Sequence, residues 1–226
     1  IQVHPNDKLA KERHNSFGKT EMWYVMQAEE EGNLIVGFSE NSSKEEYVKH
    51  LENKSLLDIL NVEKVKKGDV YFIPTGRIHA IGAGVLLAEI QQTSDITYRV
   101  YDWDRVDDEG NSRDLHTEMA LDANDYSAQE KYATSYKKEV NKATQIVDCK
   151  YFTTNLIVVD GKVAINNESI DSFKIYLCVD GEVIIKYNDL KEVKLLKGET
   201  VLMPATFKEY QFLSSDKSEL LEVYIK

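Results

Sequence analysis

Four side chains in this 226-residue chain have the types and the spacing of a metal site. Gln2 and His4 lie two positions apart in the opening sequence IQVHP, and Glu21 and His79 lie further along the chain. In a β-strand, residues i and i+2 project from one face with Cα atoms roughly 7 Å apart, so Gln2 and His4 could reach one ion. Two imidazoles and a carboxylate form a common catalytic zinc set, and the same set binds non-haem iron. A Gln-x-His pair alone, however, is more often an ordinary polar strand face.

An internal repeat helps to separate site residues from packing residues. The segment KGDVYFIPTGRIHAI, residues 67–81, parallels KGETVLMPATFKEYQ, residues 197–211, and upstream EMWYVMQAEEEGNLIVGF parallels FKIYLCVDGEVIIKY. In this alignment His79 stands opposite Glu209, and Glu21 stands opposite Phe173. A residue needed for packing should tend to survive in both copies, whereas a residue needed for a site should occur only where the site is. We therefore interpret Glu21 and His79 as functional residues.

The elements that must position these residues are short runs rich in Val, Ile, Tyr and Phe, separated by Gly, Asp and Asn. Such runs predict many antiparallel strands in a sandwich or barrel. Gly-Asp followed by an apolar strand and a proline is also typical of cupin-type jelly rolls. The expected strands cover residues 22–26, 33–38, 69–73, 84–90, 97–100, 151–159, 173–179, 182–187, 200–203 and 220–225.

The fold class that we predict is mainly β, with two cupin-like jelly-roll barrels related by the repeat. Residues 43–60 place apolar side chains at helical spacing, which predicts a small helical insertion at about 42–61 in the first barrel. The expected domains are a metal-binding catalytic barrel at 1–126, a linker or surface segment at 127–147 and a second, metal-free barrel at 148–226.

Composition and charge exclude several classes of partner. A net charge of −11 argues against a nucleic-acid-binding surface, because phosphate backbones need clustered Lys and Arg, although a small anionic substrate needs only a local basic pocket. The longest apolar runs are far too short to span a bilayer, and no secretion signal is recognisable. The two cysteines, Cys149 and Cys178, fit a reducing compartment better than a disulfide framework. We therefore expect a cytoplasmic protein without nucleic-acid or membrane partners.

Other polar residues receive no role in this interpretation. His14, His50 and His116 are interpreted as surface residues. The stretch DWDRVDDEG, residues 102–110, is acidic enough to suggest calcium, but it lacks the spacing of an EF-hand loop. A solvated loop is the better interpretation.

Four ordered motifs, taken together, resemble a known family. QVHP, HNSFGKTEMWYV, IPTGRIHAIG and EIQQTSDITYRVYDWDR closely resemble the type I mannose-6-phosphate isomerases of the cupin superfamily, in their short bacterial form. The resemblance runs through nearly the whole chain and includes the helical insertion and the later CKYFTTNLIVVDG. Members of that family carry a substantial segment before QVHP, so the resemblance implies that this chain lacks its N-terminal segment.

The resemblance also implies a set of functional residues. One zinc ion per chain would be held by the matching residues Gln2, His4, Glu21 and His79. The active-site arginine of the family falls on Arg99, and further active-site positions match Lys19, Glu89 and Asp95. Arg105 is similar, with a looser match, to a basic residue that meets the substrate phosphate.

Aldose–ketose interconversion gives these residue types a chemical role. The reaction moves a proton between adjacent carbons through an enediol, which needs a proton-transfer group and stabilisation of negative charge on oxygen. We expect Glu89 to act as acid or base and Arg99 to stabilise the enediolate. Lys19 and Arg105 would contact phosphate or sugar oxygens, with Asp95 also in the substrate pocket.

The function that we expect is a zinc-dependent isomerase interconverting mannose 6-phosphate and fructose 6-phosphate, as a monomer or a homodimer. One alternative is another metal-dependent cupin enzyme, either an isomerase of a different sugar phosphate or an iron dioxygenase. A second alternative is a non-catalytic cupin that binds sugar. This last alternative explains poorly why Lys19, Glu21, His79, Glu89 and Arg99 all occur in the first copy.

Overall fold

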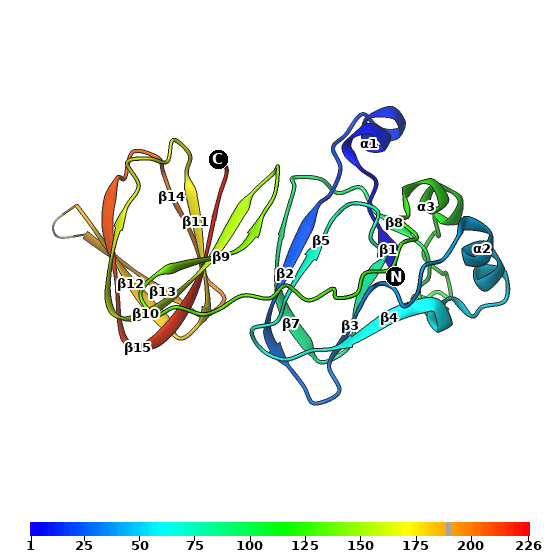
Figure 1. The fold of residues 1–226 in the computed structure, drawn as a ribbon, viewed down its shortest axis with the longest axis horizontal. Coiled ribbons are helices and arrows are strands. Elements are labelled where there is room, and N and C mark those ends of the chain that lie inside the picture. Colours follow the sequence, from blue (N-terminus) through cyan, green and yellow to red (C-terminus); the bar gives the residue numbers. More distant parts are fainter. Residues whose placement is uncertain (189–190) are drawn as a thin grey trace. The chain divides into compact units, whose positions relative to one another are not determined.

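The computed structural model describes residues 1–188 and 191–226, and the chain divides into two compact units (Figure 1). Unit 1 covers Ile1–Thr134 and unit 2 covers Ser135–Lys226. The predicted fold class, mainly β with two cupin-like units and a helical insertion in the first, is confirmed. Within each unit the strands form jelly-roll-like sheets that do not close into barrels.

Unit 1 contains two antiparallel sheets. The five-stranded sheet has the order β4 (Leu60–Lys64), β3 (Asn33–Phe38), β6 (His79–Ile81), β1 (Gln2–Val3) and β8 (Tyr98–Arg99). The three-stranded sheet has the order β5 (Val70–Ile73), β2 (Glu21–Ala28) and β7 (Val85–Gln91). A core that includes Trp23, Leu34, Val36 and Ile73 contains residues of both sheets, as alternating side chains on facing strands require.

The other face of the five-stranded sheet is covered by helices. Helix α2 (Lys44–Glu52) and the short 3₁₀ helix η1 (Leu56–Ile59) lie inside the predicted insertion, and α3 (Thr117–Ala123) packs in the same cluster through Ala120. Val3 and Ile35 point into this second cluster. Successive strand residues face opposite sides, so Gln2 and Val36 are left on the side that faces the three-stranded sheet.

Unit 2 is a single seven-stranded sheet that folds over one core. Its main path runs β13 (Lys191–Leu196), β12 (Glu182–Tyr187), β15 (Glu209–Tyr224), β10 (Thr153–Asn166) and β9 (Ala143–Asp148). Strand β11 (Lys174–Asp180) pairs with β15 and with β14 (Thr200–Met203). The long strands β10 and β15 pair along their length, with an irregularity between Val159 and Gly161.

The segment predicted as a linker, residues 127–147, includes part of a strand. Strand β9 begins at Ala143 and pairs with β10, and the boundary between the units falls between Thr134 and Ser135. Helix α1 (Asp7–His14) lies in unit 1 between His4 and Lys19. In the part of the chain that the structure describes, every helix is too short or too polar to cross a lipid bilayer.

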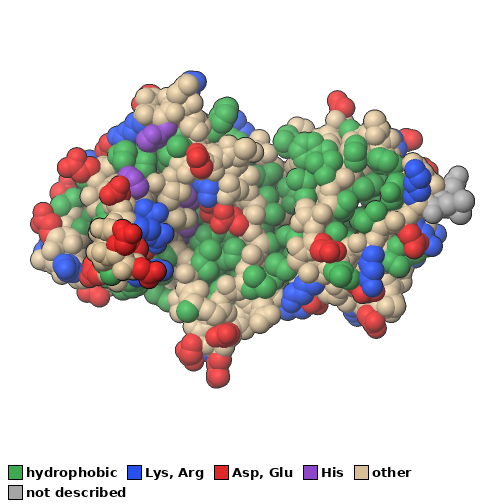
Figure 2. Space-filling view, turned by 180° about the vertical axis from the view of Figure 1, so that it is seen from behind, with side chains coloured by type: hydrophobic (Ala, Val, Ile, Leu, Met, Phe, Trp, Pro, Cys, Tyr) green, Lys and Arg blue, Asp and Glu red, His purple; other side chains and the backbone are tan. Residues whose placement is uncertain are grey.

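The surface carries both signs of charge. Figure 2 shows acidic side chains at many points of one face, with basic side chains among them, as a net charge of −11 leads one to expect.

Candidate metal centre

Three strands of unit 1 bring the four predicted ligands together. Gln2 lies on β1 and is the cross-strand partner of His79, the first residue of β6. His4 comes directly after the end of β1, and Glu21 is the first residue of β2 in the opposite sheet. The cluster therefore lies between the two sheets, where the site is shielded from water by the core of unit 1.

The distances within this cluster suit a single small ion. His4 Nε2 lies 3.0 Å from Glu21 Oε1, and His79 Nε2 lies 3.7 Å from Glu21 Oε2. One ligand atom from each of these residues falls within 4.8 Å of the others. All three side chains are buried, and the Gln2 amide reaches His79 Nε2 at 3.1 Å.

Backbone carbonyls orient both imidazoles. His4 Nδ1 lies 2.9 Å from the carbonyl oxygen of Ile96, and His79 Nδ1 lies 2.7 Å from that of Arg77. Each Nδ1 must therefore carry a proton and donate it, so that Nε2 is the nitrogen with the lone pair when the ring is neutral. Carbonyl partners of this kind are typical of histidines that bind metals through the other nitrogen.

The resulting donor set fits a divalent cation. His4 Nε2 and Glu21 Oε2 are buried without a hydrogen-bond partner among the described residues, which is costly for polar atoms unless something else binds them. Two imidazole lone pairs and a carboxylate are the ligands that zinc prefers, and the Gln2 amide can turn its oxygen to the same side. The ligand atoms of His4, Glu21 and His79 all face one another with lone pairs, so a bound cation would remove the repulsion between them.

The electrostatics of the cluster keep these ligands in their binding forms. Burial opposes ionisation of Glu21, but His4, His79 and Lys19 more than offset it and lower its pKa to about 2. Burial, followed by the effect of neighbouring His4, lowers the pKa of His79 to about 3. At neutral pH the centre therefore offers an ionised carboxylate and a neutral His79 imidazole, the forms that bind metals.

Two further predicted residues border the centre. Lys19 Nζ lies 2.5 Å from Glu21 Oε1 and 3.5 Å from Glu89 Oε1. The other oxygen of Glu89 accepts a hydrogen bond from Trp23 Nε1 at 3.0 Å. Glu89 is thereby held on two sides, while its side chain remains 29% exposed and open to a ligand.

Arg99 and Asp95 take different positions. Arg99 is the cross-strand partner of Gln2, so both side chains belong to the same face of the sheet. Its guanidinium donates to the carbonyl oxygen of Asp114 at 3.0 Å. Asp95 is exposed in the segment between β7 and β8. The structure thus puts Arg99 next to a ligand strand and leaves Asp95 at the surface.

Arg105 lies in a separate basic cluster of unit 1. Its side chain is 63% exposed, stacks over the ring of Trp103 at 5.3 Å and approaches Asp102 at 3.6 Å. Asp102 is held more firmly by Arg113, whose Nε and Nη2 donate to its two oxygens at 2.7 and 2.5 Å. The hydrogen bonds from Arg113, which outweigh the effect of burial, lower the pKa of Asp102. Asp102, Arg105 and Arg113 are among the residues that line a pocket of about 300 Å³.

Sequence reasoning missed two groups that orient the centre. Trp23 fixes Glu89, and its ring lies against that of His79 with centroids 5.2 Å apart. The alternation in EMWYV was the available signal, because it places Glu21 and Trp23 on one face. The carbonyls of Ile96 and Arg77 carry no sequence signal, since every residue has one.

Fold and site together define a class: a protein of two cupin-like units, one of which holds a buried His/Glu/His set with a metal-binding arrangement.

Comparison with known proteins narrows the class. The model of the mannose-6-phosphate isomerase cupin domain matches residues 142–224. The mannose-6-phosphate isomerase of Streptococcus mutans is 34% identical over 213 residues, which are 94% of this chain and 66% of that protein. The isomerase ManA of Bacillus subtilis is 32% identical over 215 residues, which are 93% of this chain and 67% of that protein.

A solved structure agrees with these relatives. The crystal structure of the mannose 6-phosphate isomerase from Bacillus subtilis matches with a TM-score of 0.88 and 32% identity, over 100% of this chain and 71% of that one. The chain belongs to the mannose-6-phosphate isomerase family. It spans 66% of the length of the first relatives that it matches.

Proposed function

We propose that this protein is a zinc-dependent isomerase that interconverts mannose 6-phosphate and fructose 6-phosphate through an enediol. The observation that carries the proposal is the buried convergence of His4, Glu21 and His79 beside Lys19 and Glu89. Relatives that match almost the whole chain are named for this activity. Both cysteines are free thiols, which agrees with a cytoplasmic enzyme.

Zinc, when bound by His4, Glu21 and His79 with Gln2, would polarise the sugar oxygens and stabilise the negative charge that develops on them. The carboxylate of Glu89 would take the proton from C2 of the open-chain aldose and return it to C1, while the hydroxyl proton on O2 passes to O1. No atom is lost or gained in this exchange. Glu89 suits the role because Lys19 and Trp23 hold it and solvent still reaches it.

Cationic side chains would bind the rest of the substrate. Lys19, whose Nζ lies 3.5 Å from Glu89, would hold the sugar oxygens, and Arg99 would stabilise the enediolate from the neighbouring strand. Arg105 would meet the phosphate with its exposed guanidinium. Asp95, which is exposed between β7 and β8, would contact the substrate from the surface of unit 1.

A coupled assay of fructose 6-phosphate formation from mannose 6-phosphate tests the proposal, with and without a chelator. We expect turnover that the chelator abolishes and zinc restores. Arg99→Ala should collapse turnover and leave zinc content unchanged, and loss of zinc in that variant would contradict the role given to Arg99. Oxygen consumption with iron, or a preference for glucose 6-phosphate as the aldose, would replace the proposal with another cupin chemistry.

A further inference from the structure

Unit 2 contains a buried polar network at the fold position that the metal centre occupies in unit 1. Strand register shows the correspondence. Glu21 pairs with Ile73 across the sheet, and Lys174 pairs with Met203, which is the repeat equivalent of Ile73. Lys174 therefore takes the place of Glu21. Alignment of the two sequences had instead set Phe173, one residue earlier, opposite Glu21.

The neighbouring positions correspond in the same way. Trp23 pairs with Glu89 and donates to it, and Tyr176 pairs with Glu222 and donates to it at 2.8 Å. Glu222 is thus the counterpart of Glu89.

The histidine positions complete the comparison. The ring of Trp23 contacts His79, and the ring of Tyr176 contacts Tyr210, so Tyr210 corresponds to His79. Gln2 pairs with His79 and Ile165 pairs with Tyr210, which makes Asn167, two residues after Ile165, the counterpart of His4. Unit 2 therefore replaces all four candidate ligands.

The replacement residues form one network. Lys174 Nζ lies 2.7 Å from Glu222 Oε1, and the hydroxyls of Tyr176 and Tyr210 are 2.5 Å apart. Asn167 Nδ2 donates to the Tyr210 hydroxyl at 2.6 Å. The Lys174 ammonium stands at the position of the Glu21 carboxylate, which in unit 1 is itself bonded to Lys19.

One atom of the network has no partner. Asn167 is 6% exposed, and its Oδ1 has no hydrogen-bond partner among the described residues. Its neighbours Asn166 and Glu168, and its partner Tyr210, line a pocket of about 1140 Å³. A buried acceptor without a partner is costly, although Asn167 itself is not among the residues that line the pocket.

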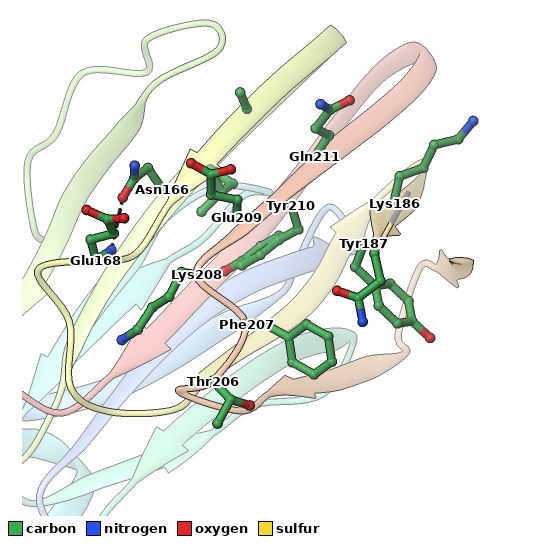
Figure 3. Close-up of a pocket in the computed structure, with 13 residues that line it drawn as sticks. Asn166, Glu168, Lys186, Tyr187, Thr206, Phe207, Lys208, Glu209, Tyr210 and Gln211 are labelled. Carbon is green, nitrogen blue, oxygen red and sulfur yellow. Dashed lines mark hydrogen bonds between the residues drawn. The ribbon is translucent and has the colours of Figure 1, made fainter. Parts of the chain in front are cut away.

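The pocket itself combines aromatic rings with planar polar groups. Figure 3 shows Tyr187 and Phe207 on one side and Asn166, Glu168 and Glu209 on the other. The two rings make an edge-on contact with centroids 5.4 Å apart, and both remain partly exposed. Aromatic faces suit the C–H face of a sugar ring, and amide and carboxylate oxygens accept its hydroxyl protons.

The charges in the pocket favour a neutral ligand. Glu168 and Glu209 balance Lys186 and Lys208. Lys186 lies 3.6 Å from Glu192, and Lys208 donates to the carbonyl oxygen of Ile170 at 3.1 Å. The lining therefore offers no excess of positive charge for a phosphate group.

We propose that this pocket of unit 2 is a binding site for a neutral saccharide, built on the converted counterpart of the metal centre. The ligand stacks on Phe207 and Tyr187, and its hydroxyl groups bond to the polar side around Tyr210 and Glu168. The site needs no metal, and it is separate from the isomerase site proposed for unit 1.

Amide NMR shifts of the whole chain, titrated with D-glucose, D-mannose or maltose, test the proposal. We expect saturable shifts at residues 186–188 and 206–211. Phe207→Ala should weaken binding about tenfold, as loss of an aromatic contact implies. Phe173→Ala removes an exposed phenylalanine of the same unit outside the pocket and should leave binding unchanged.

Two further variants make the result decisive. Glu21→Gln, which affects the unit 1 centre, should leave sugar binding intact, so this test stands whether or not the isomerase proposal holds. If Phe207→Ala loses amide dispersion, Tyr187→Leu replaces it with the same expected weakening. The proposal would be overturned if amide shifts were confined to unit 1 or absent at tens of millimolar sugar. It would also be overturned if the pocket variants bound sugar as tightly as the unchanged chain. Tighter binding of mannose 6-phosphate than of mannose at residues 206–211 would contradict a neutral ligand.

Discussion

At the scale of single residues, the candidate metal centre depends on which nitrogen each histidine presents. The carbonyls of Ile96 and Arg77 bind both Nδ1 atoms, so His4 and His79 can turn only Nε2 toward Glu21. The two rings therefore need no reorientation when a cation arrives. Preorganised ligands of this kind bind metal more tightly than free ones.

Glu21→Gln should remove metal binding. The change takes away the only carboxylate among His4, Glu21 and His79. Loss of a residue that only orients a ligand typically lowers metal affinity 10- to 100-fold. Loss of a direct ligand should cost more, so we expect zinc affinity to fall by about 100-fold or more. Equilibrium dialysis with zinc measures the loss. Glu89→Gln is the matched control and should retain zinc, and an unchanged affinity in Glu21→Gln would place the ion elsewhere.

Lys174→Met should destabilise unit 2. The Lys174 and Glu222 side chains are 9% and 4% exposed, and removal of one partner leaves a buried charge, which costs about 3 kcal/mol. Denaturant unfolding, followed by amide signals of unit 2, gives the free energy change. Lys194→Met breaks an exposed pair with Glu182 and should cost less than about 0.5 kcal/mol. Equal costs for the two variants would show that the buried pair carries no special weight.

The sequence pointed to the candidate ligands in two ways, by the spacing of Gln2 and His4 and by the repeat for Glu21 and His79. The structure brings His4, Glu21 and His79 together. Arg105 shows the limit of motif matching. The motif does not reveal that Trp103 and Asp102 hold this side chain, since only the folded loop brings them together. The counterpart of Glu21 was misplaced by one residue, because alignment of letters does not show strand register.

At the scale of elements, helix α1 and the loop after it carry Lys19 to the centre. The Asn6 side chain caps the helix by accepting from the Leu9 amide at 2.9 Å, and Asn15 ends it with a φ of 52°. Asp7 then accepts the Gly18 amide at 3.0 Å. The returning loop is thereby fastened to the start of the helix just before Lys19.

Gly18→Ala should loosen this attachment. A Cβ at Gly18 would lie 2.8 Å from the Asp7 backbone nitrogen, which cannot move without shifting the helix start. Overpacking of this kind costs about 1–3 kcal/mol, and displacement of Lys19 should lower turnover as well. Thermal unfolding and the coupled assay measure both effects. Gly110→Ala meets nothing within 4 Å and should affect stability alone, through its φ of 85°. Wild-type behaviour of Gly18→Ala would show that the loop adapts.

Elements with a clear apolar pattern were predictable, and elements without one were not. The predicted strands at 33–38, 182–187 and 200–203 match β3, β12 and β14. Helix α1 buries only Ala10, so its sequence has no apolar stripe to detect. Strand β15 was predicted only from 220 onward, because the SSDKS stretch looks like a turn although it lies within the strand.

At the scale of the whole molecule, each unit has its own core and its own buried polar cluster. The clusters differ in what they need. In unit 1 two histidines and Glu21 present acceptors to a common centre, with Lys19 bonded to Glu21 at its side, whereas in unit 2 an ammonium group, that of Lys174, takes the position of Glu21 itself. A change in the zinc concentration should therefore change the stability of unit 1 but not that of unit 2.

Zinc should stabilise unit 1 and leave unit 2 unchanged. A ligand that binds only the folded state adds about 2.7 kcal/mol at a free concentration one hundred times its dissociation constant. Both tryptophans, Trp23 and Trp103, lie in unit 1, so tryptophan fluorescence follows the unfolding of that unit. Amide signals of β10 to β15 follow unit 2. Equal shifts of both transitions with zinc would show that the units unfold together.

The Lys174–Glu222 pair has a consequence for the life of the protein in a cell. The Lys174 ammonium group is part of the polypeptide, so neither a chelator nor zinc starvation can remove it. Shortage of zinc would then stop the chemistry proposed for unit 1 and leave the proposed saccharide pocket of unit 2 intact, so the chain would respond separately to zinc and to saccharide.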